Sequence, residues 1–175
     1  MGDQKHLLYV MGEPGIGKST VVRALKGEQA YEDYDHPFYF RRYDCGVVEL
    51  GADRVDYPGT DSLGLDAQPK VVKWIEAIRP DLVLGEGDRL GNGAFFDAMA
   101  GLGYRLWLYH LEGEDLAAAR RAQRGSHQDE AWIKGRRTKF KDLSIRFGAQ
   151  DIRSSLPPHL TARLFQGPVA QAFRD

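Results

Sequence analysis

The chain has 175 residues, and its 24 Lys and Arg residues against 25 Asp and Glu residues give a net charge of −1. Hydrophobic residues make up 42% of the chain and charged residues 28%, which is typical of a globular domain and excludes wholesale disorder. The balanced charge excludes a global attraction to nucleic acid, although a local basic patch is compatible with it. We expect one domain spanning residues 1–175.

The cysteine content and the lengths of the apolar segments indicate in which cellular compartment the protein is expected. The single cysteine, Cys45, excludes an internal disulfide and is compatible with a reducing cytosol. The apolar run Leu7–Met11 is shorter than the apolar region of a secretory signal. The sequence also lacks a run approaching the roughly 20 apolar residues needed to span a bilayer. We therefore expect a soluble, cytoplasmic protein with no membrane partner.

Hydrophobic spacing predicts alternating strands and helices along most of the chain. In chain order the predicted elements are strand Leu7–Met11, helix Lys18–Lys26, strands Phe38–Arg42 and Val47–Leu50, helix Ala67–Arg79, strand Asp81–Leu84, helix Ala94–Leu102, strand Tyr104–Leu111, helix Asp115–Arg124, and one or two helices within Asp129–Phe147. In the tail, residues 148–175, the segment Leu160–Phe165 fits either a last strand or a short helix. This alternation predicts an α/β fold with a parallel sheet and helices on both faces.

The turn after the first predicted strand carries the most specific signal. Residues 12–19 read G-E-P-G-I-G-K-S and match the G-x-x-x-x-G-K-[ST] phosphate loop, with a strand before it and a helix after it. Its glycines let backbone N–H groups approach phosphate oxygens, Lys18 reaches the β- and γ-phosphates, and Ser19 enters the Mg²⁺ shell. The residues expected to bind the nucleotide here are Gly12, Pro14, Gly15, Ile16, Gly17, Lys18, Ser19 and Thr20.

An acidic partner follows the strand predicted at residues 81–84. Glu86 and Asp88 lie two residues apart, so both point to the same side if the extended backbone continues past Leu84. We favour Asp88 as the base that takes the proton of an attacking hydroxyl and Glu86 as the metal-shell residue, with the reverse assignment open. Arg89 beside them either binds phosphate or pairs with a surface acid.

Arginines are concentrated at residues 120–137. Arginines carried by a mobile lid can stabilise the charge that phosphoryl transfer spreads over the equatorial oxygens, and can exclude water. Arg124, at the end of a predicted helix, and Arg136, across the polar segment 125–128, are the chosen lid residues. Arg124 is expected to act in catalysis, and Arg120 and Arg136 to bind the nucleotide.

The phosphate loop, the acidic pair and the arginine lid, in this order, resemble the nucleoside and nucleotide monophosphate kinase group of P-loop kinases. Asp88-Arg89 is similar to the Asp-Arg pair of thymidylate kinases, and residues 57–61 are faintly similar to their Pro-Gly-Gly-Thr substrate segment. The Arg-Glu that precedes that segment in thymidylate kinases has no close match here, and the lid differs from that of adenylate kinase. The resemblance implies a three-layer P-loop kinase fold of about five parallel strands with the phosphate-loop strand central, and it implies ATP and Mg²⁺ as cofactors.

The acceptor is left open by the sequence. In similar kinases the acceptor lies between the phosphate loop and the second acidic strand, where Arg41 and Asp61 are the polar residues chosen for it, together with Arg89. Further candidates in that region are Arg42, Gln68, Tyr39, Tyr43 and Tyr57.

Three functions fit these residues. The first is a kinase acting on a free nucleoside or nucleotide. The second resembles bacteriophage kinases that phosphorylate 5-hydroxymethyluridine within DNA, with a basic path along residues 134–141. The third is an ATPase or switch with no acceptor, although the Asn-Lys-x-Asp motif of guanine recognition is absent from the sequence.

Overall fold

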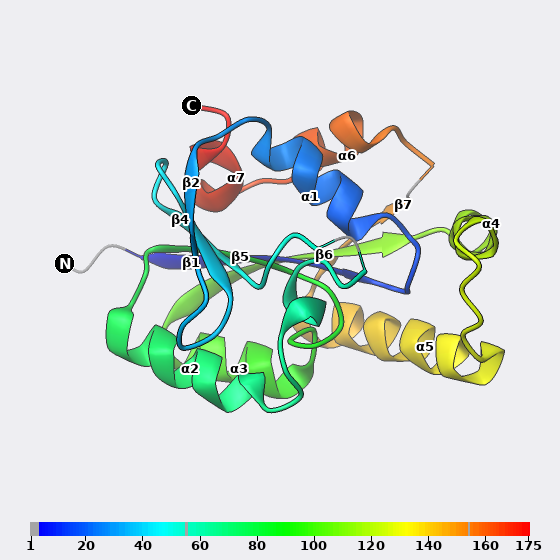
Figure 1. Ribbon diagram of the computed structural model, residues 1–175, viewed down its shortest axis with the longest axis horizontal. Coiled ribbons are helices and arrows are strands. Elements are labelled where there is room, and N and C mark those ends of the chain that lie inside the picture. The colour runs from blue at the N-terminus through cyan, green and yellow to red at the C-terminus, as the bar shows by residue number, and fades with distance from the viewer. Residues whose placement is uncertain (1–3, 55, 154) are drawn as a thin grey trace.

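The computed structural model describes residues 4–54, 56–153 and 155–175. Its strands are β1 (Lys5–Gly12), β2 (Tyr31–Tyr34), β3 (Phe40–Tyr43), β4 (Val47–Leu50), β5 (Leu82–Glu86), β6 (Tyr104–Glu112) and β7 (Gln150–Arg153). They form one sheet in the order β2-β3-β4-β5-β1-β6-β7 (Figure 1).

Five of these strands, β4, β5, β1, β6 and β7, are mutually parallel and have β1 at their centre. The expected number of parallel strands and the central phosphate-loop strand are therefore confirmed. The five parallel strands are not the five predicted ones, because β3 pairs antiparallel with β2 and β4 and so belongs to a hairpin that extends the sheet. The fifth parallel strand is β7, in the tail that could not be assigned from the sequence.

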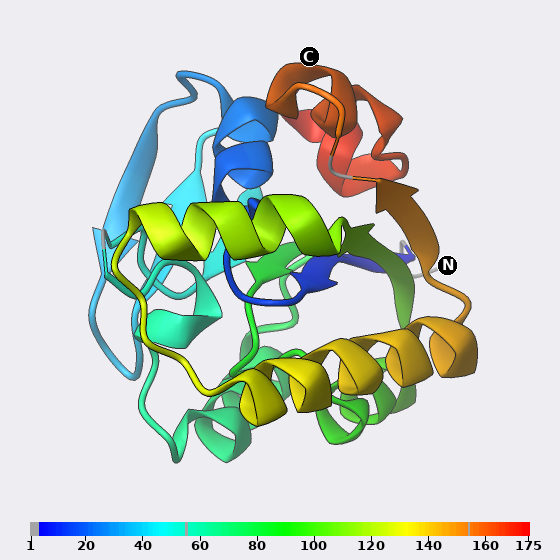
Figure 2. The same cartoon turned by 90° about the vertical axis from the view of Figure 1, so that its right-hand side faces the viewer.

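Helices cover both faces of the sheet and make three layers. The helices are α1 (Lys18–Lys26), α2 (Ala67–Ile78), α3 (Gly93–Gly101), α4 (Glu114–Gln123), α5 (Glu130–Phe147), α6 (Pro158–Leu164) and α7 (Pro168–Ala172), with a 3-10 turn at Thr60–Ser62. Helices α1, α6 and α7 lie on one face, and α2, α3 and α5 lie on the other (Figure 1). Helix α4 crosses in front of the carboxyl ends of the strands (Figure 2).

Burial of β1 on both faces explains its continuous apolar run. Leu7, Tyr9 and Met11 pack into the core under α2, α3 and α5, whereas Leu8 and Val10 pack into the core under α1, α6 and α7. A central parallel strand has no solvent face, so it shows no polar alternation. Gly12, the last residue of this strand, begins the phosphate loop, so the loop is attached to the middle of the sheet.

Two predicted elements are now settled by the structure. Helix α5 is continuous through Gly135, so the alternative of two helices is wrong. Residues 160–164 lie in helix α6, which Phe165 follows in an extended conformation, so this segment forms a short helix and not a strand. The tail packs on the sheet, since Phe165 and Val169 are fully buried beside α1 and Phe173 lies edge-on to Tyr43 at 5.0 Å. Among the described residues, no helix is both long and apolar enough to cross a membrane.

A buried ion pair ties the hairpin extension to α1. Lys26 at the end of α1 donates to both carboxylate oxygens of Glu49 on β4, at 2.9 and 3.0 Å, and both residues are buried. The Tyr43 hydroxyl on β3 donates to the same carboxylate at 2.7 Å. A charge buried this deeply is tolerated only while its partner is present.

We expect Lys26→Met to lower the free energy of unfolding by about 3–5 kcal/mol, because it leaves the Glu49 carboxylate buried without its cation. The double variant Lys26→Met/Glu49→Gln keeps an acceptor for Tyr43 and is expected to recover a large part of that loss. Urea denaturation of both variants measures the difference. A double variant as unstable as the single variant would contradict this assignment.

Candidate active site

The loop between β1 and α1 has the backbone conformation that phosphate binding requires. Gly15 and Gly17 adopt φ values of 84° and 103°, which glycine reaches without the strain of a side chain. Gly17 is also the N-cap of α1, and its lack of a side chain leaves the first-turn N–H groups for an external anion. The predicted loop therefore leaves backbone N–H groups that could bind a phosphate.

Lys18 is buried at the start of α1 and points back into the loop. Its ammonium donates to the carbonyl oxygens of Gly12 and Glu13, at 2.8 and 3.1 Å. Burial lowers the pKa of Lys18, and the negative charges of Glu86 and Asp61 oppose that shift. The loop thus holds a cation at its centre, where the terminal phosphates of a nucleotide would lie.

Ser19 and Glu86 meet at the mouth of the loop. The Ser19 hydroxyl donates to Glu86 Oε1 at 2.7 Å, and Glu86, at the end of β5, is only 3% exposed. Burial raises the pKa of Glu86 to about 7, against the opposing effects of Lys18 and Ser19. A hydroxyl and a carboxylate are hard oxygen ligands of the kind Mg²⁺ prefers, so these residues fit that ion.

The raised pKa of Glu86 predicts how stability depends on pH. The ordinary pKa of a glutamate is 4.5, so the unfolded chain loses the Glu86 proton near that pH, whereas the folded protein keeps it up to about pH 7. The free energy of unfolding therefore falls as pH rises from 4.5 to about 7, because Glu86 must ionise while buried, and it stays lower at higher pH. We expect Glu86→Gln to stabilise the EDTA-treated protein by about 1–3 kcal/mol at pH 8 and to leave it nearly unchanged at pH 4.5.

Thermal unfolding of both proteins at the two pH values measures this difference. A gain of equal size at both values would assign the effect to packing and not to ionisation.

The turn after β5 separates the two acids that the sequence placed together. The extended backbone continues past Leu84 only as far as Glu86, and Gly87 has a φ of 113°, so the condition for both acids to point to the same side is not met. Glu86 contacts Ser19, whereas Asp88 faces α5. The different surroundings of the two acids support different roles for them.

Asp61 shapes this turn. Its Oδ1 accepts hydrogen bonds from the backbone N–H groups of Asp88 and Arg89, both at 2.9 Å. Next to it, the buried Tyr9 hydroxyl contacts Thr60 Oγ1 at 2.9 Å and donates to the Gly87 carbonyl at 3.1 Å. Asp61, expected to contact the acceptor, is thus engaged in holding the turn after β5.

Helix α5 supplies two cations to Asp88. Lys139 Nζ lies 2.5 Å from Asp88 Oδ1, and an Arg136 nitrogen lies 3.1 Å from Oδ2. The Arg136 guanidinium also sits over the ring of Trp132, 4.8 Å from its centroid. Arg136 was expected at the nucleotide and Lys139 was not expected at Asp88, because residues far apart in sequence are joined here only by tertiary packing.

Two arginines of α4 bind the phosphate loop through its carbonyl groups. Arg120 donates to the Ile16 carbonyl and Arg121 to the Pro14 carbonyl, both at 2.7 Å. A Cβ at Gly17 would lie 2.6 Å from an Arg120 nitrogen, so this glycine also makes room for the helix. Arg120, expected to bind the nucleotide, thus contacts the backbone of the loop, and Arg121 does so beside it.

Arg124 lies past the end of α4 and is exposed.

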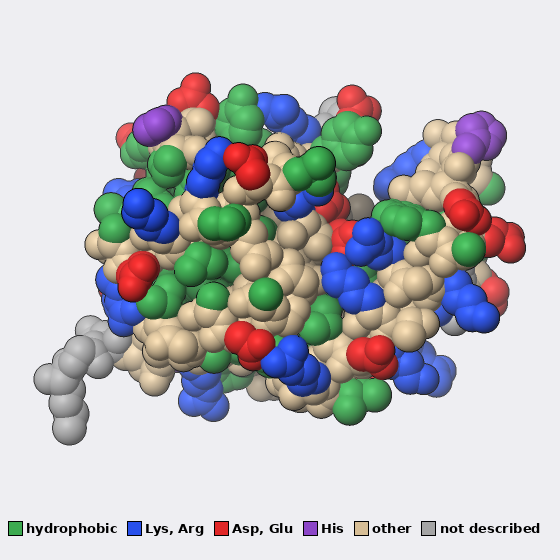
Figure 3. Space-filling view, turned by 90° about the horizontal axis from the view of Figure 1, so that it is seen from below, with side chains coloured by type: hydrophobic (Ala, Val, Ile, Leu, Met, Phe, Trp, Pro, Cys, Tyr) green, Lys and Arg blue, Asp and Glu red, His purple; other side chains and the backbone are tan. Residues whose placement is uncertain are grey.

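Figure 3 shows a hollow between the main body and an arm, which is formed by α4 and the start of α5 on the right of Figure 1, and basic and acidic side chains line this hollow. Arg89 is half-buried, and its Nε is buried without a hydrogen-bond partner among the described residues. This unsatisfied donor beside Asp88 is suited to an anionic or oxygen-rich group of an acceptor.

Several acceptor candidates lie elsewhere. Arg41 pairs with Asp33 at 2.7 Å and stacks on Tyr31 at 3.7 Å, on β3, which two strands separate from β1. Arg42 is on the same strand, Tyr43 bonds to Glu49, and Gln68 accepts a bond from Asn92 at 2.7 Å. Tyr39 lies under Arg54, and Tyr57 is 66% exposed. Arg41, Arg42 and Tyr43 are thus on the outer hairpin, and Gln68 is on α2. Thr20, expected to bind the nucleotide, is exposed on α1 directly after Ser19.

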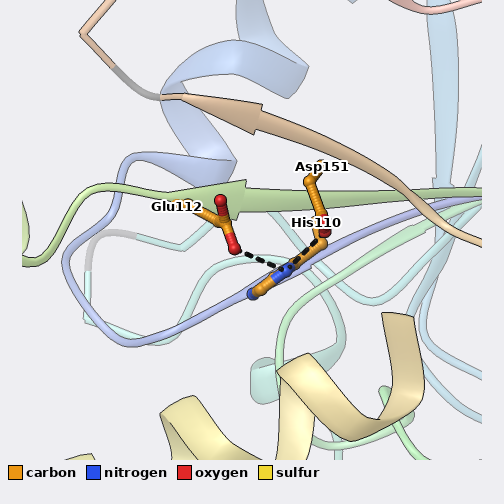
Figure 4. A group of neighbouring side chains, drawn as sticks. All are labelled: His110, Glu112 and Asp151. Atoms are coloured by element: carbon orange, nitrogen blue, oxygen red, sulfur yellow. Dashed lines mark hydrogen bonds and ion pairs between the residues drawn. The ribbon is translucent and has the colours of Figure 1, made fainter. Parts of the chain in front are cut away.

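A second group of ligand-type side chains lies between β6, β7 and α5 (Figure 4). His110 Nδ1 contacts Asp151 at 2.9 Å and Glu112 at 3.7 Å, and Ser144 of α5 donates to the same Asp151 oxygen at 2.7 Å. These residue types can bind a divalent cation. The two carboxylates are about half exposed, and Asp151 already accepts two bonds, so we assign the group to fastening β7 and α5 to β6.

Comparison with known proteins shows the family and a similar fold. A gluconokinase from Sinorhizobium meliloti 1021 has a similar fold, with a TM-score of 0.51 and 16% sequence identity over 98% of this chain and 91% of that one. Among curated proteins none matches the sequence. A family model described as P-loop Nucleotide Kinase3 matches residues 3–156, which include the phosphate loop, the β5 turn and the lid. The chain therefore belongs to the P-loop Nucleotide Kinase3 family and is a phosphotransferase.

Proposed function

We propose that this protein is an ATP- and Mg²⁺-dependent kinase that transfers the γ-phosphoryl group to a hydroxyl or phosphate of a nucleoside- or nucleotide-type acceptor. The contact between Ser19 and Glu86 carries this proposal, because it places a hydroxyl and a buried carboxylate beside the Lys18 ammonium. Bound at Ser19 and Glu86, Mg²⁺ would supply neutralisation of phosphate charge.

The residues of the loop bind and orient the donor. Backbone N–H groups at the start of α1 and the Lys18 ammonium are directed at its phosphate oxygens. Little covalent chemistry is required of the protein in phosphoryl transfer, so positioning and charge stabilisation account for most of the rate.

Asp88 serves as the base of the proposed reaction. Its carboxylate has about four acceptor positions, so it can accept the proton of an acceptor hydroxyl while Lys139 and Arg136 hold it in place. Arg89, with its unsatisfied Nε, is placed to bind the acceptor on the same side. The exposed Trp132 ring, stacked on Arg136, offers a face on which a base could stack.

Transfer of label from γ-labelled ATP tests the proposal. The protein is incubated with Mg²⁺ and, in turn, with free nucleosides, nucleotides, DNA containing 5-hydroxymethyluridine, and gluconate. Label on a free nucleoside or nucleotide supports the acceptor proposed here, and label on the DNA supports the modified-base alternative. Free phosphate alone would indicate an ATPase, and label on gluconate alone would contradict a nucleoside-type acceptor.

Lys18→Ala is expected to abolish transfer, because the ammonium binds phosphates, and to leave the fold intact, because its hydrogen bonds go to the carbonyl groups of Gly12 and Glu13 in the loop. Circular dichroism checks the fold, and the label assay checks the rate. An unchanged rate would overturn the role of Lys18.

Arg124→Ala is expected to lower kcat by roughly tenfold or more and to change nucleotide affinity far less, because its charge is needed mainly in the transition state. Steady-state kinetics and calorimetric titration with a non-hydrolysable ATP analogue measure the two effects separately. Equal losses of rate and affinity would place Arg124 at the bound nucleotide from the outset.

A further inference from the structure

Glu13, the second residue of the phosphate loop, has a charge opposite to what such a loop needs. It is only 4% exposed, and its backbone carbonyl accepts a bond from Lys18 at 3.1 Å. A buried carboxylate beside a phosphate site repels the ligand and costs desolvation energy. The proposed function gives this residue no role, so its contacts require another explanation.

One oxygen of Glu13 joins two helices. Arg121 of α4 donates to Glu13 Oε2 at 3.2 Å, and Arg137 of α5 donates to the same oxygen at 3.0 Å. Arg121 also donates to the Pro14 carbonyl of the loop at 2.7 Å. Helices α4 and α5 flank the exposed segment 124–129, which carries Arg124. The loop and both arms of the lid therefore meet at a single carboxylate.

We propose that Glu13 is a positioning residue that couples the phosphate loop to the lid through Arg121 and Arg137. This role rests on the proposed function, and it explains how the arginine lid is held in position relative to the bound phosphates. A shift of the loop on nucleotide binding moves the Glu13 carboxylate, and both helices follow because each holds it by a charged hydrogen bond.

Removing the carboxylate has two opposite effects. The loop loses a negative charge, and Arg121 and Arg137 each lose one acidic contact, so the local potential becomes more favourable for phosphates. At the same time α4 and α5 lose a shared anchor, and small misplacements of catalytic groups can cost roughly a hundredfold in rate. The rate is thus expected to fall while the affinity for ATP stays the same or rises, which general damage to the fold does not produce.

Glu13→Gln tests this in steady-state kinetics with ATP. We expect kcat to fall by roughly ten- to a hundredfold, with KM for ATP unchanged or lower. Glu13→Asp keeps the charge on a shorter side chain and is expected to regain part of the rate. An unchanged kcat, or a higher KM with no partial rescue by Asp, would overturn the proposal.

Asp97→Asn is the matched control. Asp97 pairs with Arg146, also on α5, at 2.7 Å, but this pair is exposed and lies near the opposite end of the helix. Asp97→Asn removes a carboxylate of α3 that pairs with α5 and does not touch the loop, and the kinetics are expected to be unchanged. A loss of rate equal to that of Glu13→Gln would show that losing any acidic partner of α5 suffices, and would contradict a specific role for Glu13.

Hydrogen exchange supplies a readout that does not depend on kinase activity. In nucleotide-free protein, Glu13→Gln is expected to speed exchange across residues 120–137, and Asp97→Asn and Lys18→Ala are expected not to. If no acceptor is ever labelled, the proposed function fails, and exchange still decides whether Glu13 holds the lid. Unchanged exchange in Glu13→Gln would overturn the coupling even in an active kinase.

A double-mutant cycle separates the α5 contact. Arg137→Met and Glu13→Gln are expected to be strongly non-additive in kcat, with the double variant close to the more impaired single variant. Additive losses would mean that the two residues act independently, and would contradict the bond as the means of coupling.

Discussion

Lys18 and Glu86 are buried in one site, and each lowers the desolvation cost of the other. Lys18 opposes the rise in the pKa of Glu86, and Glu86 is the largest opposing influence on the fall in the pKa of Lys18. Lys18 begins α1 just after the loop that follows β1, and Glu86 ends β5, which pairs with β1 in parallel. The rest of the site is arranged around this pair of charges, and the pair depends on the register that aligns Val10 with Glu86.

A ring of charged contacts surrounds that pair and closes on the lid. Asp88 holds Arg136 and Lys139, and Glu13 holds Arg121 and Arg137, so α5 is attached to two sides of the cleft. Most of these arginines are already bonded to acids or carbonyl groups. A ligand that enters must therefore exchange with existing bonds, which makes the position of the lid sensitive to what occupies the loop.

The sequence predicted the loop, α1 and the acid after β5, since each follows from local spacing and residue type. It could not predict that α5 delivers Lys139 to Asp88, because that contact depends on how a helix packs more than forty residues later. Strand β2 was missed because its four residues, Tyr-Glu-Asp-Tyr, are all exposed and show no apolar alternation. Asp61 was assigned to a substrate from its neighbourhood, and only the fold shows that its carboxylate is engaged by two backbone N–H groups.

The two outermost strands have a consequence for how copies of this protein meet. Strands β2 and β7 each have four residues, and each presents charged side chains, Glu32 and Asp33 on one and Asp151 and Arg153 on the other. Short charged borders discourage strand-to-strand association between molecules. The apolar parallel strands thus lie between two edge strands that disfavour the addition of a further strand from another molecule.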